Sequence, residues 1–242
     1  MAQLILAGLY ALLAGTANMI GGLIVLGPAR RVPSALNLLV AFGAGFMLAV
    51  AVLEMLPDAV TTPAGAAMVL IGYLAVHLTQ HTLTPHFHFG EETHREAMVS
   101  RGIGLWALVG LIPHSFFDGV AIAGGVLQSP ELGLMIFSAV ILHKVPTGVS
   151  LASVMLASGN SGQRTILAVA LVGLATVLGA VITPAFDFLA IHGLGLATGV
   201  LIYVAASNLI PESQHQPGWT TPGSVFLGVL AFWLITLLLP GI

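Results

Sequence analysis

The chain consists almost entirely of long apolar stretches, and this pattern restricts its fold more than any other feature. Only 6% of its 242 residues are charged, whereas about a quarter are charged in an ordinary soluble domain. A helix needs about 20 mostly apolar residues to cross a bilayer, so the chain has room for about eight such helices and short loops. The sequence therefore predicts an all-α integral membrane protein whose single transmembrane domain covers residues 1–242.

Polar stretches and stretches rich in proline and glycine divide the chain into eight expected helices. These cover residues 4–26, 35–57, 64–83, 103–127, 131–157, 165–187, 193–212 and 223–240. The first is too long for the apolar core of a signal peptide, so we expect it to be retained. The chain has no cysteine. A metal ion would therefore have to be held by histidine, carboxylate, amide, hydroxyl or methionine side chains.

The basic residues predict the orientation of the chain in the membrane. Five of the six lie outside the expected helices, and all five fall on one side: Arg30, Arg31, Arg95, Arg101 and Arg164. The positive-inside rule assigns that side to the cytoplasm. Both termini are therefore expected outside, and residues 84–102 are expected to form the main cytoplasmic loop, which contains histidines.

The second and seventh expected helices resemble each other. Residues 45–58 align with residues 199–212 at a constant offset of 154, and both segments end in a proline followed by an acidic residue. The second helix would run outward and the seventh inward, which predicts an inverted repeat of helices 1–3 and 6–8 around central helices 4 and 5. A chance similarity between helices rich in small residues is the alternative.

Four ionisable side chains are expected near the middle of the fourth and fifth helices. They are His114, Asp118, His143 and Lys144. At a rise of about 1.5 Å per residue, both histidines lie about half-way through a hydrocarbon core about 30 Å thick. Ionisable groups are costly at that depth, so they usually face the inside of the bundle and mark a pathway or a binding site.

The spacing of these residues predicts a metal site. His114 and Asp118 share a helix face, as do His143 and Thr147. Two facing helices would then direct imidazole and carboxylate ligands to one point, a set that favours Zn²⁺, with Fe²⁺ or Mn²⁺ next and Cd²⁺ left open. Pro113 and Pro146 lie beside the histidines and could bend both helices there. The alternative is a buried hydrogen-bonded network that only holds the helices together.

These features resemble the ZIP (Zrt-/Irt-like) family of metal transporters over essentially the whole chain. Residues 114–119 and 143–148 are similar to the motifs of the family's fourth and fifth helices. The resemblance implies eight helices with both termini outside, and an elevator-type motion of helices 1, 4, 5 and 6. The family's metal positions fall here on His114, Ser115, Asp118 and His143, with Met47 added as in some relatives.

Two positions depart from relatives that hold two metal ions. Lys144 and Thr147 stand where such relatives often have acidic residues, and the sixth expected helix has no carboxylate before Asp187. The resemblance therefore implies one central metal site. In it, Lys144 is expected to be a charge partner of Asp118 and not a ligand.

Other polar residues are expected along a pathway and in a metal-binding tract. We expect Glu54 and Asp58 toward the outer end of the second helix, and Asn208, Glu212 and His215 on the inner half of the seventh. A low-affinity metal tract is expected at His77, His81, His86, His88 and His94. Each of these groups could also be ordinary interfacial or solvated polar residues.

The sequence thus predicts a transporter that moves a divalent metal ion, Zn²⁺ first, into the cytoplasm by alternating access. The metal is expected as cargo and not as a catalytic cofactor, and no phosphate-binding loop suggests ATP use. An intramembrane zinc hydrolase is the alternative, although Lys144 is the one catalytic group that can be named for it. A proton or cation relay is a third.

The expected partners are the metal ion and the lipid bilayer of a cell (inner or plasma) membrane. No nucleic acid is expected, and a homodimer is left open.

Overall fold

The structure is a computed structural model that describes residues 2–27, 34–82, 101–213 and 218–238, and within these ranges it is helical with no strand. The helices are α1 (Ala2–Leu26), α2 (Ser34–Ala49), α3 (Leu56–Ala59), α4 (Pro63–Thr82), α5 (Arg101–Gln128), α6 (Pro130–Ala157), α7 (Gly162–Ile182), α8 (Asp187–Tyr203), α9 (Ile210–Ser213) and α10 (Thr220–Leu238). Two π-helical turns, η1 (Val50–Met55) and η3 (Val204–Leu209), and one 3₁₀ turn, η2 (Thr183–Ala185), join some of them.

Eight long helical rods, some continued by a short turn, make up the described part of the chain, and this number agrees with the sequence prediction. Seven stretches of the described chain are long and apolar enough to cross a membrane, and α4 adds a shorter apolar stretch, Pro63–Thr79. Two helices begin earlier than the sequence suggested. The sixth rod ends in the η2 turn, so α8 begins at Asp187 and not at residue 193, and α5 begins at Arg101, inside the loop predicted for residues 84–102. Residues 83–100 lie outside the described part of the chain.

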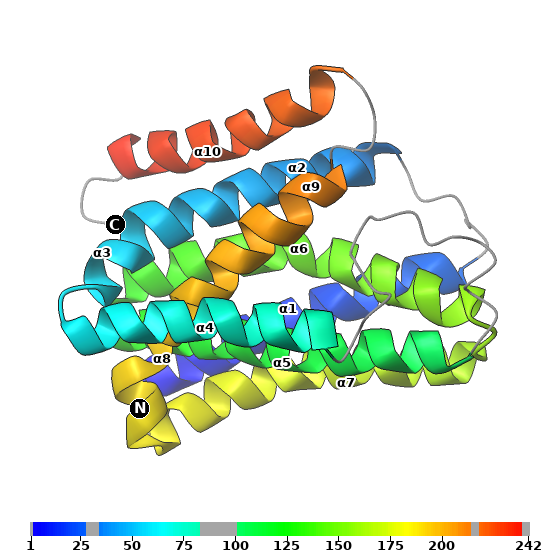
Figure 1. Ribbon diagram of the computed structural model, residues 1–242, viewed down its shortest axis with the longest axis horizontal. Coiled ribbons are helices and arrows are strands. Elements are labelled where there is room, and N and C mark those ends of the chain that lie inside the picture. The colour runs from blue at the N-terminus through cyan, green and yellow to red at the C-terminus, as the bar shows by residue number, and fades with distance from the viewer. Residues whose placement is uncertain (1, 28–33, 83–100, 214–217, 239–242) are drawn as a thin grey trace.

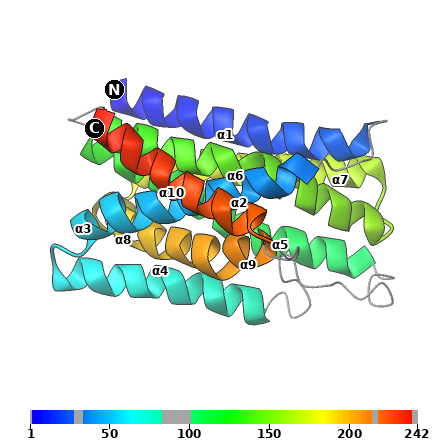
Figure 2. The same ribbon diagram turned by 90° about the horizontal axis from the view of Figure 1, so that it is seen from above.

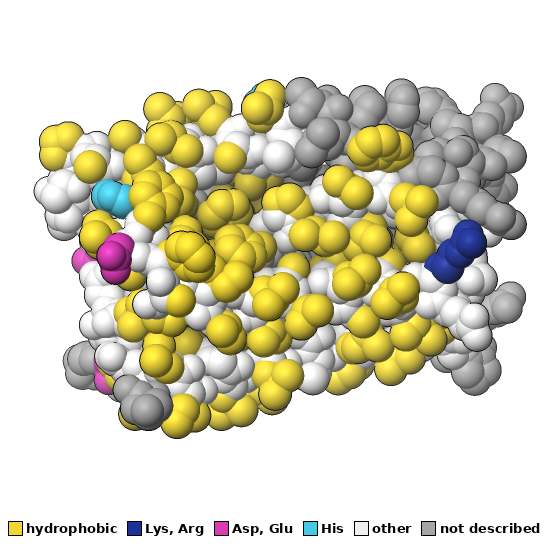
Figure 3. Space-filling model, turned by 90° about the horizontal axis from the view of Figure 1, so that it is seen from below, with side chains coloured by type: hydrophobic (Ala, Val, Ile, Leu, Met, Phe, Trp, Pro, Cys, Tyr) yellow, Lys and Arg dark blue, Asp and Glu magenta, His cyan; other side chains and the backbone are white. Residues whose placement is uncertain are grey.

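The surface has the pattern of a membrane protein. Both ends of the chain lie at the same end of the molecule (Figure 1), which agrees with an even number of crossings. Figure 3 shows acidic and histidine side chains near that end and a basic side chain near the other, with an apolar surface between them. The 40 large hydrophobic side chains exposed among the described residues supply this apolar surface, which suits contact with lipid tails.

Glycines pack the helices in pairs at backbone distance. In each pair, a Cβ added to a glycine of either helix would overlap a backbone carbonyl oxygen of the other helix. Small residues permit such close approach in membranes. The glycines are Gly21 and Gly148 between α1 and α6, Gly119 and Gly179 between α5 and α7, Gly45 and Gly228 between α2 and α10, and Gly72 and Gly199 between α4 and α8.

The packing of the helices divides the rods into two groups. α1, α5, α6 and α7 form the first group, in which α1 also meets α7 at backbone distance through Gly15 and Gly173. The second group consists of α2, α4, α8 and α10, together with the short segments that continue α2 and α8. Where α2 meets α6, the nearest atom to a Cβ at Gly43 is the side-chain Cβ of Leu142, at 3.3 Å. In Figure 2, α1 lies at one edge of the molecule and α4 at the opposite edge.

The second group repeats its local structure at the spacing found in the sequence. η1 and η3 are offset by the same 154 residues as the aligned sequence segments. In both, the residue before a proline donates its N–H to the carbonyl five positions earlier: Leu56 to Ala51, and Ile210 to Ala205. α2 and α8 run in opposite directions (Figure 2). The predicted inverted repeat therefore holds for this pair of helices.

Candidate metal centre

The site lies on a hairpin of two long helices. α5 and α6 have 28 residues each, and Ser129 alone separates them. The Ser129 hydroxyl accepts the N–H of Leu132, and Pro130 occupies the first turn, so α6 starts abruptly. His114 and His143 each lie half-way along their helix. A tight hairpin of equal helices therefore brings both to the same depth, and both helices continue through Pro113 and Pro146.

His114, Asp118 and His143 converge at one point. Their ligand atoms all lie within 4.8 Å of one another, and the side chains are 5%, 0% and 1% exposed. Both imidazole Nε2 atoms lie 3.4 Å from the same carboxylate oxygen, Asp118 Oδ2. Two imidazole nitrogens and one carboxylate oxygen can hold a metal ion such as Zn²⁺ with a position left for a further ligand.

The surroundings of His143 orient its ring. Nδ1 lies 3.1 Å from the carbonyl oxygen of Ala139, one turn earlier in α6. When Nδ1 carries the hydrogen, it donates to that carbonyl and Nε2 keeps its lone pair for a metal ion, as is common for metal-binding histidines. Nδ1 of His114 and Oδ1 of Asp118 are buried and have no hydrogen-bond partner.

Lys144 forms an ion pair with the carboxylate. Its Nζ lies 2.7 Å from Asp118 Oδ2 and donates to Ser115 Oγ at 2.9 Å. All three residues are fully buried. A buried charge without a partner is strongly destabilising, so the fold depends on both members of this pair.

The remaining residues predicted near the centre are also buried. Thr147 donates its hydroxyl to the carbonyl of His143 at 2.8 Å, so it supports the backbone of α6. Met47 is fully buried in α2. It lies one turn after Gly43, which approaches Leu142 of α6, so Met47 is on the side of α2 that faces the helix of His143.

The predicted pathway residues are dispersed. Glu54 lies half-buried in η1, and Asn208 lies half-buried at the equivalent position of η3. Asp58 is exposed in α3 and accepts a hydrogen bond from Gln128 of α5 at 2.7 Å. Glu212 is in α9, but its side chain and all of His215 lie outside the described residues.

The predicted histidine tract is only partly described. His77 is exposed on α4, and its ring packs edge-on against Tyr203 with 5.8 Å between centroids. His81 belongs to α4, but its side chain lies outside the description, as do His86, His88 and His94.

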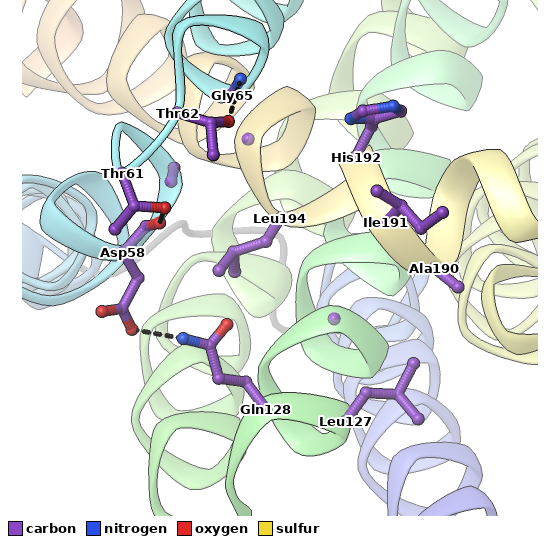
Figure 4. Close-up of a pocket in the computed structure, with 13 residues that line it drawn as sticks. Asp58, Thr61, Thr62, Gly65, Leu127, Gln128, Ala190, Ile191, His192 and Leu194 are labelled. Carbon is purple, nitrogen blue, oxygen red and sulfur yellow. Dashed lines mark hydrogen bonds between the residues drawn. The ribbon is translucent and has the colours of Figure 1, made fainter.

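A pocket of about 360 Å³ opens where the two helix groups meet, at the end of the molecule that holds α3 and the start of α8. Figure 4 shows Asp58, Thr61 and Thr62 on one side of it, Gln128 below and His192 above, with the Asp58–Gln128 hydrogen bond drawn across one edge. Sequence reasoning missed Gln128 and His192. Within its own helix, neither has a polar partner three or four residues away, so only the packing of three distant segments brings them to this pocket.

Comparison with known proteins gives a family and several relatives. Residues 90–238 match the family model described as ZIP zinc transporter. The zinc transporter ZupT of Enterobacter sp. (strain 638) is 33% identical over 184 residues, which cover 71% of this chain and 70% of that protein.

Two eukaryotic relatives are more distant. The zinc transporter YKE4 of Saccharomyces cerevisiae is 24% identical over 77% of this chain and 63% of its own length. The zinc transporter ZIP9-B of Xenopus laevis is 26% identical over 61% of this chain and 52% of its own length. The chain thus matches between half and about two thirds of the length of these two relatives.

Proposed function

This chain belongs to the ZIP family of zinc transporters, and from that premise we propose that it carries a divalent metal ion across a membrane through the buried group of His114, Asp118 and His143. The observation that carries the proposal is the convergence of their three ligand atoms at the middle of a hairpin in a membrane bundle. Ionisable groups are expensive at that depth and usually serve a pathway.

The ligand chemistry supports Zn²⁺ as the cargo. Two neutral imidazoles and one carboxylate suit Zn²⁺ better than Ca²⁺ or Mg²⁺, which prefer oxygen ligands. Fe²⁺, Mn²⁺ and Cd²⁺ are further cargoes that this ligand set accepts, since affinity alone discriminates poorly among such ions. The three relatives compared above are named zinc transporters.

The division into two helix groups supports alternating access. All residues of the proposed site belong to the first group, α1, α5, α6 and α7. Motion of this group relative to the second would expose the site to one side and then to the other. The outer pocket beside Asp58 would be the entrance, with Glu54 below it. Asn208, Glu212 and His215 would line the exit.

The direction proposed is into the cytoplasm of a cell whose inner or plasma membrane holds the protein. Arg164 lies near the start of α7, at the end opposite Asp187 of α8. Under the positive-inside rule, Arg164 and the arginines at or between the expected helix ends support a cytoplasmic location for that end, with both termini outside.

The hydrolase alternative receives no support. The family model and the relatives are described as transporters, and Lys144, the one catalytic group that the sequence suggested, is held in an ion pair with Asp118.

Uptake of radioactive zinc into proteoliposomes tests the proposal. The purified protein is compared with His114→Ala, Asp118→Ala and His143→Ala. We expect saturable uptake by the unaltered protein and loss of uptake in all three variants, since each removes a ligand. Ser138→Ala is the matched control, because its hydroxyl bonds only to its own helix at the carbonyl of Leu134, and it should transport normally.

Two results would contradict the proposal. Tight zinc binding without any uptake by the unaltered protein would leave a structural role for the metal. Unchanged uptake in the three alanine variants would place the pathway elsewhere.

A further inference from the structure

Lys144 contacts the carboxylate oxygen that a metal ion would need. Of the two oxygens of Asp118, Oδ2 lies 3.4 Å from both histidine Nε2 atoms and 2.7 Å from Lys144 Nζ. The other oxygen, Oδ1, has no hydrogen-bond partner. The ammonium and the two imidazoles therefore converge on one oxygen atom.

A metal ion and the ammonium compete for that oxygen. A metal ion held by both imidazoles and Oδ2 would stand about 2 Å from each ligand atom, and so within a few ångströms of an ammonium that keeps its present contact. Two cations repel each other strongly at such a distance in a site without water. A metal ion bound through Oδ2 therefore requires Lys144 to move away from that oxygen, and the flexible stem of Lys144 allows this.

The charge of the site matters for the return step of a transport cycle. Without metal, neutral imidazoles, one carboxylate and one ammonium have a net charge of zero, and without Lys144 the same site would have an unpaired negative charge at mid-membrane. Burying such a charge is strongly unfavourable. A carrier that moves its site across the membrane must return that site without cargo in every net cycle.

We propose that Lys144 is a built-in substitute for the transported cation, which neutralises Asp118 after the metal has left and so allows the unloaded site to return. The proposal rests on the transport function proposed above. Lys144 is then a positioning residue with two effects. It lowers the affinity of the site for the metal ion, and it raises the rate of net transport. A residue whose sole role was to hold α5 against α6 would affect net uptake of zinc and exchange of zinc across the membrane to the same extent.

Net uptake and metal exchange separate these roles. Net uptake requires the unloaded site to return, whereas exchange of external radioactive zinc for internal unlabelled zinc uses only loaded sites. In proteoliposomes with Lys144→Met, we expect the maximal net uptake rate to fall at least about tenfold, because an unpaired buried charge must cross. We expect exchange to stay within about twofold of the unaltered protein, and the KM for zinc to fall, because the competing cation is gone.

Two further variants sharpen the experiment. Lys144→Gln can still donate a hydrogen bond but has no charge, so it should behave as Lys144→Met does. Lys144→Arg keeps the charge and should recover part of the net uptake. Ser138→Ala, on the same helix and outside the site, should not change the ratio of net uptake to exchange.

The outcomes are distinct. Three results would overturn the proposal: an equal loss of net uptake and exchange, an unchanged ratio of the two rates, or failure of both uncharged variants to fold. Lys144 would then have only a structural role in holding the helices together. Absence of uptake and exchange in the unaltered protein would instead refute the transport function itself.

Discussion

The two helix groups differ in the regularity of their backbones. In the first group, α5 and α6 remain α-helical through Pro113 and Pro146, where the proposed ligands lie. In the second group, α2 and α8 give way to π-helical turns at positions related by the repeat. π-Helical turns are rare and occur frequently at functional sites. The regular group thus fixes the geometry of the site, while π-helical turns interrupt two helices of the other group.

The contacts within and between the groups also differ. Several helix pairs within a group touch at backbone distance through glycine, whereas between the groups α2 meets α6 at the Cβ of Leu142 and α5 meets α8 beside the backbone of Leu194. Backbone contacts permit little sliding because an overlap with a carbonyl cannot be relieved by a rotamer change. The contacts at Gly43 and Gly124, which face the other group, are wider, with 3.3 Å and 3.5 Å from an added Cβ to the nearest atom, so we expect motion to be least hindered along the boundary between the groups.

The largest expected effect comes from the ion pair inside the regular group. Asp118→Asn should destabilise the protein by about 3–5 kcal/mol, because it leaves the Lys144 ammonium buried without its partner. The double variant Asp118→Asn with Lys144→Met should be less destabilised than Asp118→Asn alone, because no unpaired charge remains. Thermal unfolding of the purified protein in detergent measures both. Simple additivity of the two single changes would show that the pair is not coupled.

An intermediate effect should distinguish contacts within a group from contacts between groups. Gly148→Ala should destabilise by about 1–3 kcal/mol, because its Cβ overlaps the carbonyl of Asn18 in α1. Gly43→Ala should cost less than about 1 kcal/mol, because its Cβ meets a side-chain atom of Leu142 at 3.3 Å. It should nevertheless change the zinc uptake rate, since it lies on the boundary. Equal losses of stability would remove the distinction between the two kinds of contact.

The smallest effect is expected at the Asp58 pocket, where a hydrogen bond joins the two groups. Gln128→Ala removes the donor to Asp58 and should change stability by at most about 1 kcal/mol, because the contact is exposed to solvent. It should alter the rate of zinc uptake more than it alters stability. Thr236→Ala removes a hydroxyl that bonds only to its own helix at Trp233 and is the control. Identical kinetics in the two variants would show that the Asp58 contact does not restrain the groups.

Much of the fold and part of the site could be predicted from the sequence. The apolar stretches determined the number and type of helices, because lipid requires each span to satisfy its own backbone hydrogen bonds. The spacing of His114 and Asp118 placed both on one face of one helix, since helical periodicity is local. The repeat at offset 154 was readable as well, although the π-helical turns that it contains were not.

The tertiary structure decided how these elements meet. It set the single oxygen, Oδ2, at which Asp118 meets both Lys144 and His143, and the contact of Asp58 with Gln128. These features join residues far apart in the chain and depend on the close approach of particular helices at glycine. Hydrophobicity and periodicity determine that a segment is a helix and which face is polar, but every helix here is apolar on several faces, so only three-dimensional packing selects its neighbours.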